Sequence, residues 1–223
     1  MSNSFQKLFS FLFLVGLLFI STIQMNAAKT IVEGSIEEFE GKKIKVGIYT
    51  DYLTFEKQWL QAQTIKDGKF HFDLELTVTT HLLLEIEDKQ TSLFAESGKT
   101  YFIKLSYDAA LNQGKAFDKM LDLNFPIPQQ NDINLEIRAF NKAYHDFFAE
   151  NYQRFVIKAA TKEIEAFVAK WDKRKATIQN EFVKNYISYS LANLEDINNV
   201  SDTKLYEKYF EQKPILWILK PIR

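Results

Sequence analysis

Apolar and polar side chains alternate along the chain from Lys29 to about Tyr107. The stretch KFHFDLEL, residues 69–76, is the most regular example, with an apolar residue at every second position. A period of two is typical of a strand with one buried face. Similar or weaker alternation elsewhere predicts six or seven short strands, within TIVEGSI, KIKVGIYTDY, KQWLQAQTI, KFHFDLEL, HLLLEIE, TSLFAES and KTYFIKLSY.

Turn signals separate these strands. Short strands divided by turns at this spacing are typical of a β-sandwich or a small barrel. No stretch with a helical period lies between them, so a parallel α/β fold is not expected. The turn signals are Glu40-Gly41, Asp67-Gly68, Asp88-Lys89 and Ser97-Gly98.

The stretch TIKDGKFHF, residues 64–72, contains either a ligand-binding loop or a turn. An EF-hand-type calcium loop needs further oxygen ligands at fixed spacing after Asp67, and Gly68, Lys69 and Phe70 supply none. Glycine adopts the positive φ of a tight turn, and aspartate tolerates it. We therefore predict a hairpin, with His71 on the polar side of its second strand.

From about Asp132 the apolar period becomes that of a helix. A first helix is expected to open at Asn131 or Asp132, and a second to have Thr161 as its N-cap. Their predicted buried faces consist of Ile137, Phe140, Tyr144, Phe147, Phe148 and Phe155 in the first helix, and of Ile164, Phe167, Val168 and Trp171 in the second.

A third apolar stripe, from Ile178 to Leu194, either continues the second helix or forms a separate helix joined to it near residues 173–177. A last short helix is expected from about Ser201 to Gln212. Pro214 would end it, because proline cannot continue a helix.

These patterns predict an α+β protein in which an antiparallel β-sandwich of six or seven strands precedes a helical region. We place the sandwich at residues 29–123, a linker at 124–132 and the helical region at 133–223. The linker, NFPIPQQND, holds two prolines and a polar end. The final segment, KPILWILKPIR, is apolar, so we expect that it packs back on the helices or that the chain is a fragment of a longer protein.

Residues 1–28 are predicted to be a secretory signal peptide. A polar start, MSNSFQK, precedes the apolar run LFSFLFLVGLLFISTI, and small residues follow at Ala27 and Ala28. The run is shorter than the roughly 20 apolar residues of a spanning helix. Neither Met25 nor Asn26 is the small residue usual before a cleavage site, so an uncleaved anchor is the alternative. No cysteine follows the run, which excludes a lipid-anchored lipoprotein.

Composition and the absence of certain motifs argue against several kinds of partner and reaction. The formal net charge is −1 over 223 residues, so nucleic acid is not an expected partner. The chain has no cysteine, which excludes thiol redox chemistry, a cysteine nucleophile and cysteine-ligated zinc. It contains no G-x-S-x-G, G-x-G-x-x-G or phosphate-loop motif, which argues against serine hydrolase and nucleotide chemistry.

Histidines and carboxylates are the remaining candidates. His71 shares a strand face with Asp73 and Glu75, and a metal site there would gain His81 if the two strands were neighbours. A solvent-exposed sheet face is the simpler interpretation. His145 has no potential ligand four residues away on its helix.

Three acidic stretches, IEEFE, LEIED and LEDIN, could supply the paired acids of a glycosidase only if separate strands brought them to a sugar-sized cleft. Exposed turn charges are favoured. The basic segment KWDKRK is interpreted as a solvated helix face, with an acidic partner as the alternative. NVS at residues 199–201 matches a glycosylation sequon.

A resemblance to a known family rests on three stretches of the chain: TIKDGKFHF, FVKNYISYSLANLE and LYEKYFEQKPIL. Their order resembles that of secreted proteins of Bacteroidetes in which a β-domain with a D-G-x-F-x-F turn precedes a helical region. The resemblance covers about Lys29 to Leu216. In many relatives a thioredoxin-like domain closes the chain, which implies thiol-disulfide oxidoreductase activity. That domain and its C-x-x-C are missing here, so no catalytic residue is carried over.

The resemblance implies a location in the periplasm or cell envelope of a bacterium. We expect a non-enzymatic binding or scaffolding module whose partner is an envelope protein or a surface glycan, with membrane contact only through the N-terminal segment if it is uncleaved. The alternative is the non-catalytic N-terminal portion of a longer thioredoxin-like oxidoreductase. A third hypothesis is a metal or carbohydrate enzyme that uses His71, Asp73 and Glu75. We assign no catalytic, cofactor-binding or metal-ligating residue and expect no cofactor.

Overall fold

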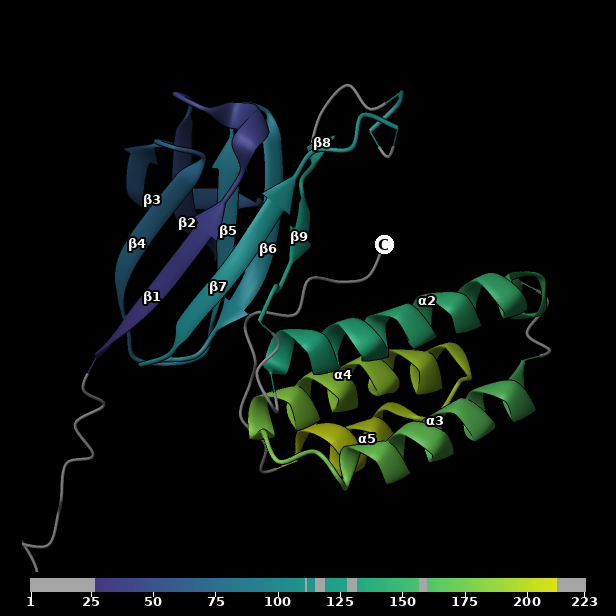
Figure 1. The fold of residues 1–223 in the computed structure, drawn as a ribbon. Helices are drawn as coiled ribbons and strands as arrows, with labels where there is room; N and C mark the ends of the chain where they lie inside the picture. The colour runs from purple at the N-terminus through teal and green to yellow at the C-terminus, as the bar shows by residue number, and fades with distance from the viewer. Residues whose placement is uncertain (1–26, 111, 115–118, 128–131, 157–159, 212–223) are drawn as a thin grey trace, which may run out of the picture.

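A computed structural model describes residues 27–110, 112–114, 119–127, 132–156 and 160–211 (Figure 1). The apolar run of the predicted signal peptide and the segment KPILWILKPIR lie outside these residues. Among the described residues, no helix is both long enough and apolar enough to cross a membrane.

The predicted α+β architecture is confirmed, with two packed sheets followed by a layer of helices (Figure 1). We call the sheet β4-β1-β7-β9 the front sheet, because it lies towards the viewer in Figure 1, and the sheet β3-β2-β5-β6-β8 the back sheet. The front strands are β1 (Ala28–Ser35), β4 (Lys69–Leu76), β7 (Thr100–Ser106) and β9 (Asp122–Asn124). The back strands are β2 (Lys43–Asp51), β3 (Glu56–Thr64), β5 (Thr80–Ile86), β6 (Lys89–Ala95) and β8 (Lys119–Met120).

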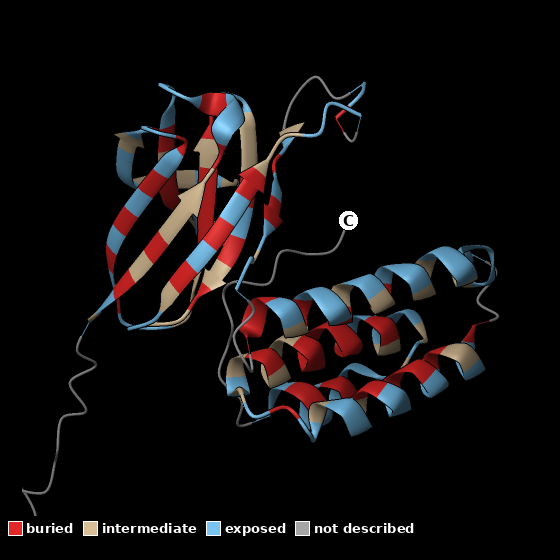
Figure 2. Cartoon of the chain, viewed as in Figure 1, coloured by how far each residue is buried: buried red, intermediate tan, exposed pale blue. Residues whose placement is uncertain are grey.

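Strands β4 and β7 follow the predicted alternation of buried and exposed positions, whereas β5 buries three successive residues (Figure 2). Within the described residues there are two further strands, β8 and β9, whose two and three residues are too few to show a period. Most ladders are antiparallel as predicted, and two, β1–β7 and β6–β8, are parallel. These partners are distant in sequence, so no hairpin fixes their relative direction.

The Asp67-Gly68 turn joins the two sheets. Both residues have positive φ, 53° and 64°, and Lys66 and Lys69 exchange backbone hydrogen bonds across the turn. The carboxylate of Glu40 accepts hydrogen bonds from the backbone N–H groups of Asp67, at 3.2 Å, and Gly68, at 2.7 Å. The predicted tight turn is confirmed, but its two strands, β3 and β4, continue into different sheets rather than pairing as a hairpin.

Strands β3 and β4 are the edges of their sheets and lie along the same side of the sandwich. The side-chain amide of Gln63 donates a hydrogen bond to the carbonyl of His71 at 2.6 Å, and Gln61 does the same for the carbonyl of Asp73. These glutamines satisfy backbone acceptors that an edge strand otherwise leaves open to another chain.

The helical layer consists of α2 (Ile133–Val156), α3 (Thr161–Lys175), α4 (Glu181–Ile197) and α5 (Asp202–Leu205), which a π-helical turn over Tyr206–Phe210 extends. The stripe that was open to two interpretations therefore belongs to a separate helix, α4. Asp132 caps α2, since its carboxylate accepts the N–H of Asn134 at 2.8 Å. Thr161 was expected to be the N-cap of α3 but is its first residue, and Ala160 occupies the cap position without a side-chain bond.

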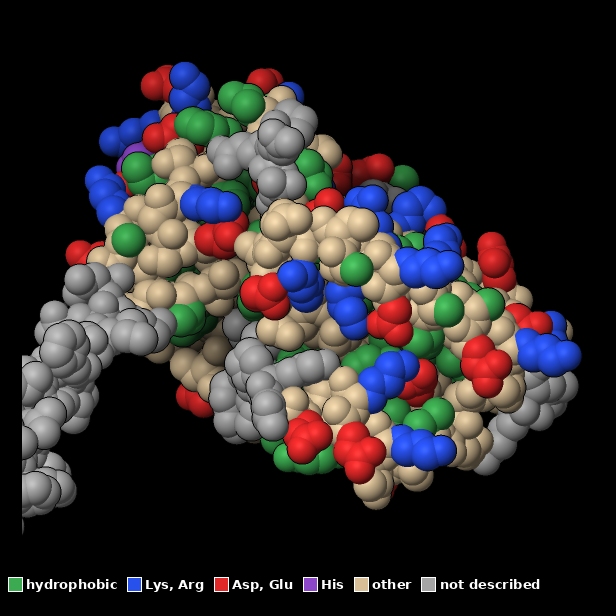
Figure 3. Space-filling view, turned by 90° about the horizontal axis from the view of Figure 1, so that it is seen from below, with side chains coloured by type: hydrophobic (Ala, Val, Ile, Leu, Met, Phe, Trp, Pro, Cys, Tyr) green, Lys and Arg blue, Asp and Glu red, His purple; other side chains and the backbone are tan. Residues whose placement is uncertain are grey.

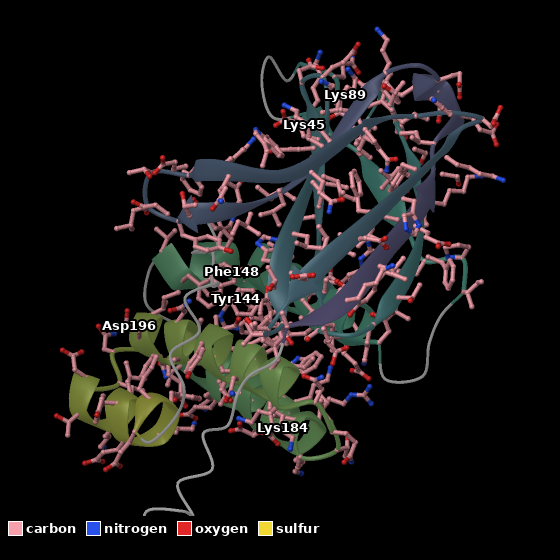
Figure 4. All side chains as sticks on the ribbon, turned by 90° about the vertical axis from the view of Figure 1, so that its left-hand side faces the viewer. Lys45, Lys89, Tyr144, Phe148, Lys184 and Asp196 are labelled. Carbon is pink, nitrogen blue, oxygen red and sulfur yellow. The ribbon has the colours of Figure 1, made fainter. Side chains whose placement is uncertain are left out.

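Two hydrophobic cores result, one between the sheets and one among the helices. Figure 4 shows Tyr144 and Phe148 within the helical layer, and Lys45 and Lys89 at the far end of the sandwich. Acidic and basic side chains are interspersed on the face of the molecule seen from below (Figure 3), in keeping with a net charge near zero.

Phe94 of β6 packs against the helices at the junction with the back sheet. Its ring lies 5.2 Å from that of Phe182 and 5.8 Å from that of Tyr186, between centroids. The buried side chain of Asn134 accepts the N–H of Phe94 at 2.7 Å and donates to its carbonyl at 2.9 Å. An asparagine at the start of α2 thus takes the place of a paired strand beside β6.

Candidate functional site

The outer surface of the front sheet carries rows of side chains that follow from the strand register. Residues paired across neighbouring strands point to the same side of a sheet. The three central rows, written from β4 through β1 to β7, are Lys69–Ser35–Lys104, His71–Glu33–Phe102 and Asp73–Ile31–Thr100. The helices lie below and to the side of the sandwich, so they leave this surface uncovered (Figure 1).

A groove of about 610 Å³ crosses the first two of these rows. One wall contains Phe102 and Ile127, which are 38% and 61% exposed. The opposite wall comes from the ends of β3 and β4 and includes Gln63 and Lys66. Ligand sites in proteins are commonly concave and apolar, with a few polar groups that fix orientation, and this groove has that composition.

His71 lines the groove and is the centre of a bonded network. Its Nδ1 lies 3.1 Å from Glu33 Oε1, and its Nε2 lies 2.9 Å from Asp73 Oδ1. A neutral imidazole can donate only one of these hydrogen bonds, and an imidazolium donates both. Lys29 lies 2.9 Å from the other oxygen of Asp73. Lys29 first, and His71 second, hold the pKa of Asp73 below its usual value.

The structure brings together His71 and Asp73 of the candidate metal site, but Glu75 lies a row beyond them, opposite Lys29. The second carboxylate on His71 is Glu33, from another strand. His81 does not join them, because β4 and β5 belong to different sheets. No group of three histidine, aspartate or glutamate side chains among the described residues is placed to hold a metal ion.

The other histidines occupy different surroundings. His81 lies on the back sheet between Tyr52 and Phe94, and its ring stacks on Phe94 with centroids 4.8 Å apart. His145 is exposed on α2, edge-on to Tyr144 at 6.4 Å. Neither contributes to the groove.

Carboxylates of the three acidic stretches form hydrogen bonds and ion pairs within the fold. Glu40 of IEEFE braces the Asp67-Gly68 turn, and Glu85 of LEIED lies between two lysines of the back sheet. Asp88 of LEIED pairs with lysines at the end of the sandwich, which lower its pKa far below the usual range. Glu195 of LEDIN binds Lys208 at 2.8 Å. None of these carboxylates lines the groove.

The basic segment KWDKRK lies at the end of α3, where Arg174 contacts Glu136 and Lys175 binds Asp172 at 2.8 Å. A second, smaller pocket of about 220 Å³ adjoins Arg174. The guanidinium of Arg174 is already paired with Glu136, so the front-sheet groove is the stronger candidate. The sequon residue Asn199 follows α4 with a φ of 59°.

Sequence analysis did not identify Phe102, Glu33 or Ser35 as site residues. The sequence holds a signal for Phe102, because it is an aromatic residue at a polar position of the alternating stretch KTYFIKLSY, directly after the inward-facing Tyr101. The pairing of Glu33 with His71 depends on the register between β1 and β4, which no local pattern records.

No protein-family model and no curated protein matches this chain. Among solved structures, the chain is similar to "NMR structure of the protein from Eubacterium rectale", with 10% sequence identity over 49% of this chain and 97% of that one. The TM-score is 0.26, so this likeness supports no conclusion about function.

Proposed function

We propose that this protein is a non-enzymatic binding or scaffolding module of the bacterial cell envelope, and that it binds its partner through the groove on the front sheet. The observation that supports this most strongly is the exposed Phe102 in the wall of a groove that also offers hydroxyl, amide and charged side chains. An aromatic side chain with such polar neighbours is typical of a recognition surface.

A binding role also suits the ionisable groups in the groove and beside it. Glu33 and Asp73 each contact a ring nitrogen of His71, so their hydrogen-bonding capacity is partly used within the protein. A general acid or base would need to be available to a substrate proton. The network instead gives the groove a fixed polar wall.

The envelope location rests on the N-terminal pattern of residues 1–28 and on the resemblance to secreted proteins. An exported chain from which this segment has been removed would begin near Lys29. N-terminal sequencing of the chain recovered from envelope fractions tests this part of the proposal, and a mature chain that still begins at Met1 would contradict cleavage.

The binding role is tested with the purified protein and an isolated envelope fraction. We expect saturable binding that Phe102→Ser weakens at least about fivefold, because this change removes an exposed aromatic contact. Leu53→Ser is the matched control, since Leu53 is 88% exposed in the β2–β3 turn of the back sheet. Binding that is absent, or equal in the two variants, would refute the groove.

A further inference from the structure

We infer that the partner bound in the groove is an acidic glycan, with a sugar carboxylate held between Lys69 and Lys104 over Ser35 and a sugar ring packed on Phe102. This inference rests on the proposed binding function and specifies its ligand. Three features of the front sheet support it: the placement of the lysines, the position of the exposed Phe102 ring, and the hydrogen bonds already formed at the sheet edge.

The two lysines flank Ser35 directly. Ser35 pairs with Lys69 on β4 and with Lys104 on β7, so the three side chains form one row on the outer surface. Both lysines are exposed, as is Lys66 at the adjacent turn. Side chains opposite each other on neighbouring strands have Cβ atoms about 5 Å apart. Lys69 and Ser35 line the groove, and the register places Lys104 in the same row on the other side of Ser35.

These lysines differ from most other lysines of the sandwich in their ion pairing. The ion pairs of the described residues occupy many lysines of the sandwich, and Lys66, Lys69 and Lys104 take part in none of them. Two nearby acids already have partners within the protein, since Glu33 lies 3.1 Å from a ring nitrogen of His71 and Asp122 accepts a hydrogen bond from Asn124. An external anion is the complementary charge for this row.

Phe102 lies in the next row, two residues before Lys104 on β7. Two residues along a strand span about 7 Å, so a ring over Phe102 has its substituents within reach of the long lysine side chain. The C–H face of a sugar ring packs on an aromatic side chain, and Ile127 extends this apolar wall. Ser35 and Gln63 are suited to hydrogen-bond sugar hydroxyls.

The sheet edge argues against an extended peptide as the partner. Peptides commonly add a strand to an open edge, where backbone hydrogen bonds supply the affinity. At β4 the carbonyls of His71 and Asp73 already accept hydrogen bonds from Gln63 and Gln61. The groove also crosses the strands, so a ligand there would meet side chains of successive strands.

The test uses polygalacturonate as the probe and isothermal titration calorimetry of the full chain as the measurement. We expect binding that weakens as salt is raised and that is lost with the methyl-esterified polymer, because esterification removes the carboxylate charge and keeps the sugar. Polyglutamate, an acidic peptide, is the comparison. Polyglutamate binding equal to that of polygalacturonate would overturn the assignment to a glycan.

The variants locate the site. The double variant Lys69→Gln/Lys104→Gln is expected to weaken polygalacturonate binding about tenfold, since each exposed charge pair contributes modestly. The matched control is Lys162→Gln/Lys170→Gln, which removes two exposed lysines of α3. Circular dichroism verifies that both variants are folded. Equal losses in the two variants, or no loss in either, would contradict the site.

The outcomes separate this inference from the proposed function. If the chain binds envelope fractions in a Phe102-dependent way but does not bind polygalacturonate, the binding function stands and the acidic glycan is refuted. If Phe102→Ser and Leu53→Ser behave alike on envelope fractions, the groove itself is refuted.

Discussion

Gly34 is the residue on which the packing of the front sheet depends most closely. It lies on β1 opposite Phe70 of β4, whose ring covers it on the core side. A Cβ at position 34 would lie 2.8 Å from two ring carbons of Phe70, closer than atoms in proteins approach. Glycine here allows a buried aromatic ring to pack directly against the backbone beneath the groove.

We expect Gly34→Ala to lower the free energy of unfolding by about 1–3 kcal/mol, because the methyl group forces the Phe70 ring out of its position. Urea denaturation followed by circular dichroism measures this. Ser35→Ala is the control, since it adds no atoms to the core. Equal stability of the two variants would mean that the ring does not pack over Gly34 as described.

At the scale of elements, the side chain of Asn134 binds α2 to β6. Asn134 exchanges two hydrogen bonds with the backbone of Phe94, and Arg138 donates another to the carbonyl of Leu123 at 2.6 Å. These bonds satisfy strand groups at the point where the sandwich meets the helices. The bonds of Asn134 couple the helical layer to the back sheet, and the bond of Arg138 couples it to β9 of the front sheet.

Asn134→Ala is expected to cost about 1–3 kcal/mol of unfolding free energy, because it leaves partly buried backbone groups of Phe94 without partners. Asn124→Ala, which removes an exposed amide, should change stability by less than about 0.5 kcal/mol. Denaturant midpoints report both changes. A small effect at position 134 would show that the junction is held by Phe94 ring packing alone.

The sequence pattern predicted the elements better than their pairing. Alternation in residues 69–76 and the helical period after Asp132 are local, and both elements form where expected. The parallel contact of β1 with β7 joins segments far apart in the chain, so it depends on tertiary packing. The groove depends on the same pairing. His71 could be placed on an outer face, but its partner Glu33 could not be named.

For the whole molecule, buried tyrosines predict how stability depends on alkaline pH. Burial raises the pKa of Tyr144 to about 12, and burial followed by repulsion from Tyr49 raises that of Tyr52 to about 12. Tyrosine in an unfolded chain titrates near pH 10. Between about pH 10 and pH 12 the unfolded chain therefore binds fewer protons than the folded protein, and stability falls as pH rises.

We expect the melting temperature to be unaffected by tyrosine titration below about pH 9 and to decline through this window. Ultraviolet absorbance of the phenolate follows the titration, and thermal unfolding at each pH follows the stability. Tyr144→Phe should make the decline shallower. Titration of all tyrosines near pH 10 in the folded protein would contradict their burial.

The proposed location and the proposed partner concern the whole molecule. The location rests on the N-terminal pattern and the resemblance to secreted proteins, and the partner rests on the groove. The helices cover one end of the sandwich and leave the front sheet open (Figure 1). Recognition through that surface requires no movement of the helical layer, so binding should leave the circular dichroism of the protein unchanged.

The most direct test of this account is the binding isotherm of the full chain on isolated envelope fractions, measured for the unmodified protein, Phe102→Ser and Leu53→Ser. The account predicts saturable binding that is at least about fivefold weaker for Phe102→Ser and unchanged for Leu53→Ser. Identical isotherms for all three proteins, or no saturable binding by any of them, would contradict it.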